Sequence, residues 1–210
     1  MTDIKICGID RVETLDAAIA ARASHVGLVF YPPSPRFLVM REAAALAARA
    51  KGQITQVGLF VDPDDTVLAE GIAAGLDAIQ LHGEESPERV AQVKARFALP
   101  VWKVLPVASA ADVARAARYQ DAADFLLFDA KTPKGSLPGG MGLRFDWNLL
   151  IGYRGAIPWG LAGGLTADNV AEAVRLTGAP LVDTSSGVES APGVKDVDKI
   201  AAFCKAARSV

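Results

Sequence analysis

Two side chains that can exchange protons stand at the ends of apolar segments. Cys7 ends the run Ile4–Cys7 and is followed by Gly8, which leaves the backbone bare. Asp129 ends the run Phe125–Asp129, so its carboxyl group should lie in a partly desolvated place that favours general acid or base chemistry. Each residue also has a structural interpretation, because a lone cysteine often packs as a small apolar side chain and an aspartate often caps a turn.

Other residues have the chemistry of anion binding. Three prolines stiffen the segment Tyr31–Arg36, and a guanidinium fixed by such a loop suits a carboxylate or a phosphate. A surface salt bridge is the alternative for Arg36. Two glycine-containing loops leave backbone N–H groups free to approach an anion. They supply the candidate phosphate-binding residues Gly163, Gly164, Ser185, Ser186 and Gly187.

His82 and Asp183 are further candidates for contact with a substrate. His82 directly follows the apolar segment Ala78–Leu81, and Asp183 ends the segment Leu181–Asp183. A hydrogen-bonded structural role is an equally good interpretation of a single histidine. The second histidine, His25, begins an apolar segment, so a histidine-rich metal site is not expected and no metal is predicted.

Eight short apolar runs must position these residues, and they alternate with alanine-rich amphipathic segments along the chain. Most of the runs are continuous, as strands buried on both faces of a parallel sheet are. The predicted strands are Ile4–Cys7, His25–Phe30, Thr55–Val61, Ala78–Leu81, Val101–Leu105, Phe125–Asp129, Ile157–Leu161 and Leu181–Asp183. The predicted helices are Val12–Arg22, Arg41–Lys51, Thr66–Ala74, Pro87–Phe97, Ala110–Tyr119, the short Trp147–Tyr153, Thr166–Leu176 and Val197–Ala207.

Eight strand–helix units in 210 residues predict an α/β fold, a single eightfold βα (TIM) barrel over residues 1–210. A doubly wound open sheet is the alternative, but its usual G-x-G-x-x-G loop is absent after the first strand. In such a barrel the active site lies at the carboxyl ends of the strands, and the loops after the seventh and eighth often hold a phosphate. The glycine loops stand at those two places, so the predicted ligand is a phosphorylated small molecule.

Composition excludes several other classes of protein. Lys and Arg number 22 against 24 Asp and Glu, a net charge of −2, which lacks the basic surface that nucleic acids or anionic membranes select. The two cysteines, Cys7 and Cys204, predict neither a disulfide framework nor a zinc site. No secretory signal and no apolar run of roughly eighteen residues is visible, so we expect a cytoplasmic protein. With no apolar stripe that would form an interface, we expect a monomer.

Short motifs follow one another in order over nearly the whole chain. They are Lys5-Ile6-Cys7-Gly8-Ile9, Tyr31-Pro32-Pro33-Ser34-Pro35-Arg36, Gln80-Leu81-His82-Gly83, Leu127-Phe128-Asp129, Phe145-Asp146-Trp147, Leu161-Ala162-Gly163-Gly164-Leu165, Asp183-Thr184-Ser185-Ser186-Gly187-Val188-Glu189 and Pro192-Gly193-Val194-Lys195-Asp196. Together they resemble the phosphoribosylanthranilate isomerase family. The two glycine loops alone would fit many sugar-phosphate barrels, whereas the whole set is specific.

The resemblance implies a cofactor-free step of tryptophan biosynthesis. In it, N-(5-phosphoribosyl)anthranilate is converted to 1-(2-carboxyphenylamino)-1-deoxyribulose 5-phosphate by an Amadori rearrangement. The family pattern implies that Cys7 is the general base, that Asp129 is the general acid and that Arg36 holds the anthranilate carboxylate, while the two glycine loops bind the phosphate. Met141 and Asp10 stand where the family usually has threonine.

The two cysteines are expected to differ in reactivity. A positive field from the phosphate loops and from Lys5 should favour the thiolate of Cys7, whereas Cys204 should be packed and slow to react.

The alternatives to this isomerase function are another phosphoribosyl isomerase or a sugar-phosphate epimerase on the same barrel, or a non-catalytic phosphosugar-binding barrel. The last would need neither Cys7 nor Asp129.

Overall fold

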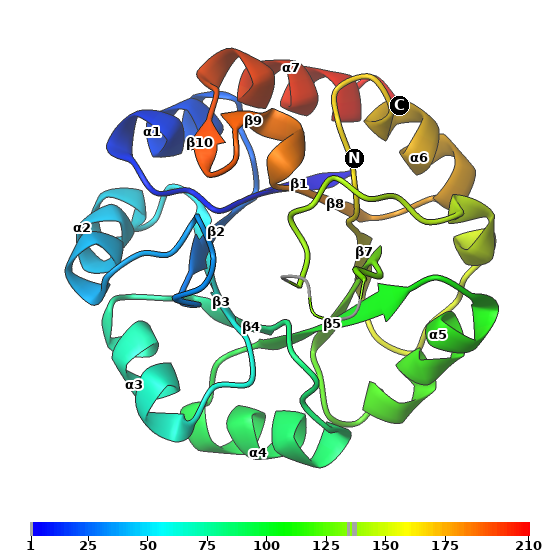
Figure 1. Cartoon of the computed structure of the whole chain (residues 1–210), viewed down its shortest axis with the longest axis horizontal. Helices are drawn as coiled ribbons and strands as arrows, with labels where there is room; N and C mark the ends of the chain where they lie inside the picture. The colour runs from blue at the N-terminus through cyan, green and yellow to red at the C-terminus, as the bar shows by residue number, and fades with distance from the viewer. Residues whose placement is uncertain (1, 134, 136–137) are drawn as a thin grey trace.

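The eight predicted strands close into one parallel barrel. In a computed structural model of the chain, which describes residues 2–133, 135 and 138–210, the strands are hydrogen-bonded in chain order from β1 to β8, and β8 pairs with β1. Figure 1 shows the strands as an inner ring and the helices as an outer one. The eightfold barrel predicted from the sequence is therefore confirmed, and the open doubly wound sheet is excluded.

The strands lie where the apolar runs predict them, with ends shifted by one or two residues. Their bounds are β1 Asp3–Cys7, β2 His25–Val29, β3 Thr55–Phe60, β4 Ala78–Leu81, β5 Val101–Val107, β6 Phe125–Ala130, β7 Trp159–Leu161 and β8 Leu181–Thr184. Each polar candidate that follows an apolar run consequently stands at the carboxyl end of a strand.

The helices follow the predicted pattern with three corrections. Their bounds are α1 Val12–Ala20, α2 Met40–Ala50, α3 Asp65–Ala73, α4 Pro87–Phe97, α5 Ala110–Ala114, α6 Val170–Thr177 and α7 Val197–Ala207. The helix predicted from Ala110 to Tyr119 continues after α5 as a 3₁₀ turn, η1 Arg115–Tyr119, and the short helix after β6 is a 3₁₀ turn, η2 Trp147–Leu150. The helix predicted from Thr166 begins at Val170, because the Asn169 side chain accepts the Thr166 N–H and forms a turn before it.

Alternate residues of each strand point into the barrel and form the floor of the site. A lower layer of apolar side chains fills the interior, and it consists of Val57, Ala78, Trp102, Val104, Leu127, Ala162 and Leu181. Above it Cys7, Val29 and Leu59 form a second buried cluster. These clusters fill much of the interior, and the reactive side chains face a pocket at the carboxyl ends of the strands.

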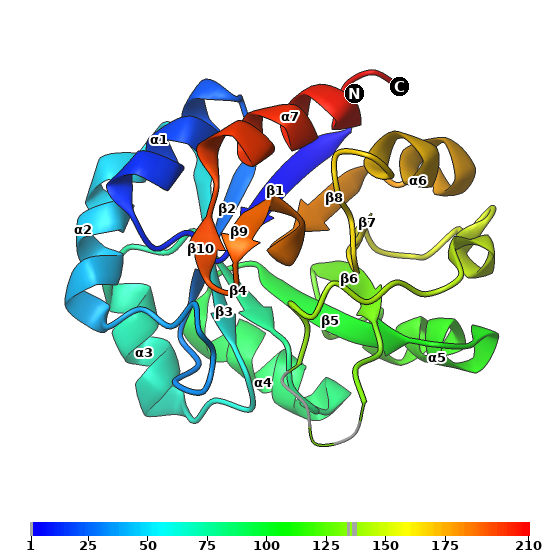
Figure 2. The ribbon, with the colours of Figure 1, turned by 45° about the horizontal axis from the view of Figure 1, so that its top comes forward.

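The chain after β8 adds a small structure at the mouth of the barrel. A 3₁₀ turn, η3 Ser186–Val188, leads into an antiparallel pair of short strands, β9 Glu189–Ala191 and β10 Val194–Lys195. Helix α7 then closes the outer ring by packing between α1 and α6, as Figure 2 shows. None of the helices in the described residues has the length and apolar character that crossing a bilayer requires.

Candidate active site

One pocket at the carboxyl ends of the strands is lined by every residue that the sequence predicts for the site. It encloses about 720 Å³, part of which is open to solvent. Its lining includes all ten predicted site residues, Cys7, Arg36, His82, Asp129, Gly163, Gly164, Asp183, Ser185, Ser186 and Gly187. Residues up to 180 positions apart in the sequence therefore meet at one site, as the barrel topology requires.

Cys7 lies beside a buried ion pair. Lys5 precedes it by two residues on β1, so both side chains face the barrel interior. The Lys5 Nζ atom lies 3.0 Å from Asp183 Oδ1. Burial raises the pKa of the Cys7 thiol, and the neighbouring Lys5 charge lowers it by less, so the pKa is higher than its ordinary value. The expectation that the local field favours the thiolate is therefore wrong in its net effect, although Lys5 does act in that direction.

Asp129 faces His82 across the pocket floor. Its Oδ1 atom accepts a hydrogen bond of 2.7 Å from the Ala130 N–H, and its Oδ2 atom lies 3.4 Å from His82 Nε2. Asp129 as a whole residue is only 8% exposed and stands at the end of an apolar strand. It is therefore oriented by one fixed backbone donor while its second oxygen faces the cavity, which is the placement that a proton donor to a bound molecule needs.

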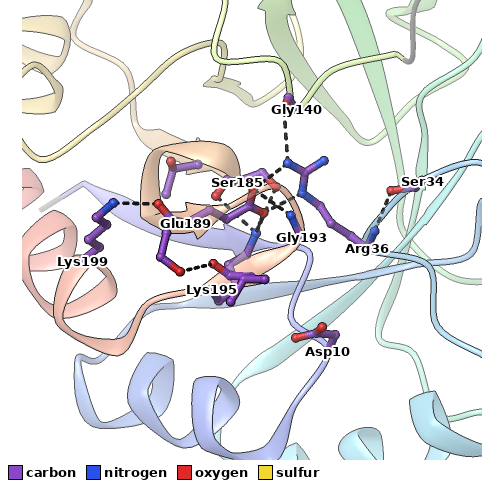
Figure 3. A network of polar contacts seen from close by, with 12 residues as sticks. Asp10, Ser34, Arg36, Gly140, Ser185, Glu189, Gly193, Lys195 and Lys199 are labelled. Carbon is purple, nitrogen blue, oxygen red and sulfur yellow. Dashed lines mark hydrogen bonds and ion pairs between the residues drawn. The ribbon is translucent and has the colours of Figure 1, made fainter.

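Arg36 is held by a buried carboxylate. Its Nε atom donates to Glu189 Oε1 at 2.7 Å and its Nη2 atom donates to Glu189 Oε2 at 2.8 Å, as Figure 3 shows. Nη2 also donates to the Gly140 carbonyl at 3.1 Å. Since Arg36 is 8% exposed and Glu189 is also buried, the interpretation of a surface salt bridge is wrong. The guanidinium retains Nη1 for an anion in the pocket.

Lys195 links this carboxylate to a predicted phosphate loop. Its Nζ atom lies 2.5 Å from Glu189 Oε1 and 3.2 Å from both the Oγ and the carbonyl oxygen of Ser185. The ammonium group is thus a buried positive charge beside the loop that should bind an anion. Lys195 and Glu189 were not predicted as site residues, although both stand in motifs that the sequence analysis quotes, because neither follows an apolar run directly.

The two glycine loops lie side by side. Gly163 and Gly164 have positive φ values of 89° and 62°, and the Thr184 hydroxyl donates to the Leu165 carbonyl at 2.8 Å, which joins one loop to the other. A Cβ atom on Gly187 would overlap that same carbonyl oxygen. Glycine is therefore required for the close approach of these loops, and residues of both loops line the pocket.

Comparison with known proteins decides the family. Residues 4–206 match the sequence model of the family described as N-(5'phosphoribosyl)anthranilate (PRA) isomerase. The chain belongs to this isomerase family. Its N-(5'-phosphoribosyl)anthranilate isomerase relative in Paramagnetospirillum magneticum is 56% identical over 208 residues, which cover 98% of this chain and 97% of the relative.

Solved structures of the family have the same fold. Phosphoribosyl anthranilate isomerase from Thermotoga maritima superposes with a TM-score of 0.90 at 35% identity, and the match covers 100% of both chains. A family structure in complex with reduced 1-(o-carboxyphenylamino)-1-deoxyribulose 5-phosphate superposes with a TM-score of 0.87 at 33% identity over 100% of both chains. The isomerase fold thus extends over the whole chain.

The buried Glu189 carboxylate gives the isomerase a predicted dependence of stability on pH. Burial raises the pKa of Glu189, but Arg36 and Lys195 outweigh this effect and lower it below its ordinary value. A carboxylate of this kind stabilises the fold above its unfolded pKa, and the contribution is lost as the pH falls through the folded pKa. Glu189→Gln should be less stable than wild type by about 3 kcal/mol at pH 7, because Lys195 loses its partner, and the difference should narrow in acid.

Urea unfolding of both proteins at a series of pH values measures this difference. A stability gap between wild type and Glu189→Gln that is constant from neutral pH to acid would contradict the assigned interaction.

Proposed function

We propose that Cys7 and Asp129 carry the proton transfers by which this enzyme isomerises N-(5'-phosphoribosyl)anthranilate. The isomerisation itself is the reaction of the family, and it is an Amadori rearrangement of tryptophan biosynthesis. The observation that carries the residue assignment is the single pocket in which a thiol, a carboxyl group and two glycine loops meet.

The pocket has two ends that suit the two ends of this substrate. Backbone N–H groups of the glycine loops after β7 and β8, beside the Lys195 charge, suit the phosphate. Val29, Tyr31, Leu59 and Val61 form an apolar wall on the side of β2 and β3, which suits the anthranilate ring. Arg36 Nη1 is the donor left for the anthranilate carboxylate.

Asp129 opens the sugar ring in the first step. Its carboxylic acid gives a proton to the ring oxygen, the bond between that oxygen and C1 breaks, and the anilino nitrogen forms a protonated Schiff base with C1. A carboxyl group with one oxygen fixed by the Ala130 N–H and the other facing the pocket is oriented for this transfer.

Cys7 acts in the second step. Its thiolate removes the proton from C2, the pair of that C–H bond forms a C1–C2 double bond, and the C1–N π pair moves to the nitrogen to give an enolamine. Protonation at C1, with loss of the proton of the C2 hydroxyl, then yields the ketone. Burial raises the pKa of Cys7 above its ordinary value, and the Lys5 ammonium opposes this by stabilising the thiolate. The rate should consequently rise with pH as Cys7 deprotonates.

Growth of a tryptophan auxotroph that lacks the isomerase tests this function. The gene for this chain should restore growth without tryptophan, and the gene for the Asp129→Asn variant should not. A sugar-phosphate epimerase or a non-catalytic phosphosugar-binding barrel would restore no growth, so failure of the wild-type gene in cells that produce the folded protein would contradict the proposal. The monomeric state and cytoplasmic location stay predictions of the sequence.

The phosphate loop gives a prediction with a matched control. Gly164→Ala should raise KM about tenfold, because Gly164 has a φ of 62° and its Cβ would lie 2.8 Å from the carbonyl oxygens of Gly142 and Leu143. Gly178→Ala carries the same backbone strain, with a φ of 67°, but meets no atom within 4 Å and lies outside the pocket. Both variants should lose stability through the strained backbone, Gly164→Ala more than Gly178→Ala because of these contacts, and only Gly164→Ala should bind substrate poorly in steady-state kinetics. Equal KM values for Gly164→Ala and Gly178→Ala would show that the loop with Gly164 does not bind the phosphate.

A further inference from the structure

Gln80 is a buried polar side chain that the mechanism above does not use. It stands on β4, is 0% exposed and lines the active-site pocket. Within the part of the chain that the structure describes, its Oε1 atom has no hydrogen-bond partner. Leaving a buried carbonyl oxygen unpaired is costly, so an acceptor held in this way inside a binding pocket points to a donor on the ligand.

The orientation of the Gln80 amide follows from its neighbours. His82 lies between the two side chains, with Nε2 at 3.4 Å from Asp129 Oδ2 and Nδ1 toward the Gln80 amide, and because an amide NH2 group can only donate, Nδ1 is the acceptor in this contact. Gln80 Nε2 lies 3.4 Å from His82 Nδ1 and is the donor to it. The amide nitrogen is therefore used by the protein, and the amide oxygen is the atom left for the substrate.

The position of Gln80 selects which part of the substrate it meets. It pairs in register with Leu59 of the apolar wall, and in the closed barrel β4 stands opposite β8 and its phosphate loop. A substrate with its phosphate at the glycine loops therefore directs its anthranilate end toward Gln80. The donor at that end is the anilino N–H.

We propose that Gln80 Oε1 accepts a hydrogen bond from the anilino N–H of the substrate and of the Schiff base formed from it. This assignment rests on the proposed function. When Asp129 opens the ring, positive charge develops on this nitrogen while its hydrogen stays in place. A fixed neutral acceptor that is itself buried stabilises the charged form more than the uncharged substrate, so Gln80 acts mainly on kcat.

A matched pair of glutamine variants tests the assignment by steady-state kinetics. Gln56 stands on the neighbouring strand β3, is 2% exposed and likewise has an Oε1 atom without a partner among the described residues, but it does not line the pocket. Gln80→Leu should lower kcat about 10- to 100-fold with a smaller change in KM, and its unfolding temperature should not fall. Gln56→Leu should leave kcat within about twofold of wild type.

Ligand binding measured by calorimetry separates the anilino group from the sugar. Reduced 1-(o-carboxyphenylamino)-1-deoxyribulose 5-phosphate carries the anilino N–H, whereas ribulose 5-phosphate does not. Gln80→Leu should bind the first about 2- to 10-fold more weakly and the second with unchanged affinity. Equal weakening of both would place the donor on the sugar and overturn the proposal, as would no weakening of either.

Two further kinetic results separate the role of Gln80 from that of His82 and from the proposed function. If Gln80→Leu has no effect on kcat when His82 is already replaced by alanine, Gln80 acts only through the histidine and the proposal is overturned. If the wild-type enzyme itself does not turn over N-(5'-phosphoribosyl)anthranilate, the proposed function fails, whereas an active wild type with an unaffected Gln80→Leu variant refutes the role of Gln80 alone.

Discussion

Replacing Asp129 with asparagine should lower kcat about 100- to 10,000-fold while leaving the fold intact. The amide keeps the shape of the side chain, and its oxygen can still accept the 2.7 Å hydrogen bond from the Ala130 N–H. What it cannot do is give a proton to the ring oxygen, so the Schiff base should not form. KM should change little, because the phosphate and carboxylate contacts lie elsewhere in the pocket.

Asp124→Asn is the matched control for this variant. Asp124 directly precedes β6, at the end of the strand opposite to Asp129, where its Oδ2 atom accepts the Val101 N–H at 2.9 Å. The control should change stability but not kcat. Near-normal turnover by Asp129→Asn would move the acid role to another group, and His82, at 3.4 Å from Asp129, would be the next candidate.

Replacing Cys7 with alanine should also lower kcat about 100- to 10,000-fold, because the C2 proton loses its acceptor. Cys204→Ala removes the other cysteine, which is 1% exposed in α7, and should leave kcat unchanged. Burial raises the pKa of Cys204 to about 11, whereas Lys5 opposes the same effect of burial at Cys7.

Alkylation kinetics provide an independent reading of the two thiols. Cys7 should be labelled first, at a rate that rises with pH, and the labelling should run in step with the loss of activity. A bound phosphate-bearing product should protect it, because Cys7 lines the same pocket. Labelling of Cys204 before Cys7, or full turnover after Cys7 is modified, would show that Cys7 is not the general base.

The sequence is informative about this fold because each apolar run ends in a polar residue that the barrel topology then gathers. Cys7, Asp129 and Asp183 could be placed at strand ends without coordinates, and all three line the pocket. The start of α6 could not be predicted, since the turn before it depends on the Asn169 side chain bonding to two backbone groups.

The electrostatics of the site could not be predicted from residue types alone. Lys5 suggested a thiolate at Cys7, but the depth of burial, which decides the sign of the pKa shift, is a property of the packed barrel. Arg36 suggested a free anion-binding group, and only the structure shows that Glu189, 153 residues further along, takes up two of its nitrogen atoms. Gln80 stands in a motif that carries the family resemblance, but its role could not be predicted, because a glutamine in an apolar run becomes noteworthy only when its oxygen is seen to lack a partner.

The fate of the hydrogen at C2 of the sugar tests the central claim most directly. Substrate that carries deuterium at C2 can be turned over once by the purified enzyme, and the label that remains in the product can be measured by NMR. We predict that wild type and Cys204→Ala release the deuterium to solvent, and that Cys7→Ala and Asp129→Asn do so at least about 100-fold more slowly. Release by Cys7→Ala at the wild-type rate would contradict the account.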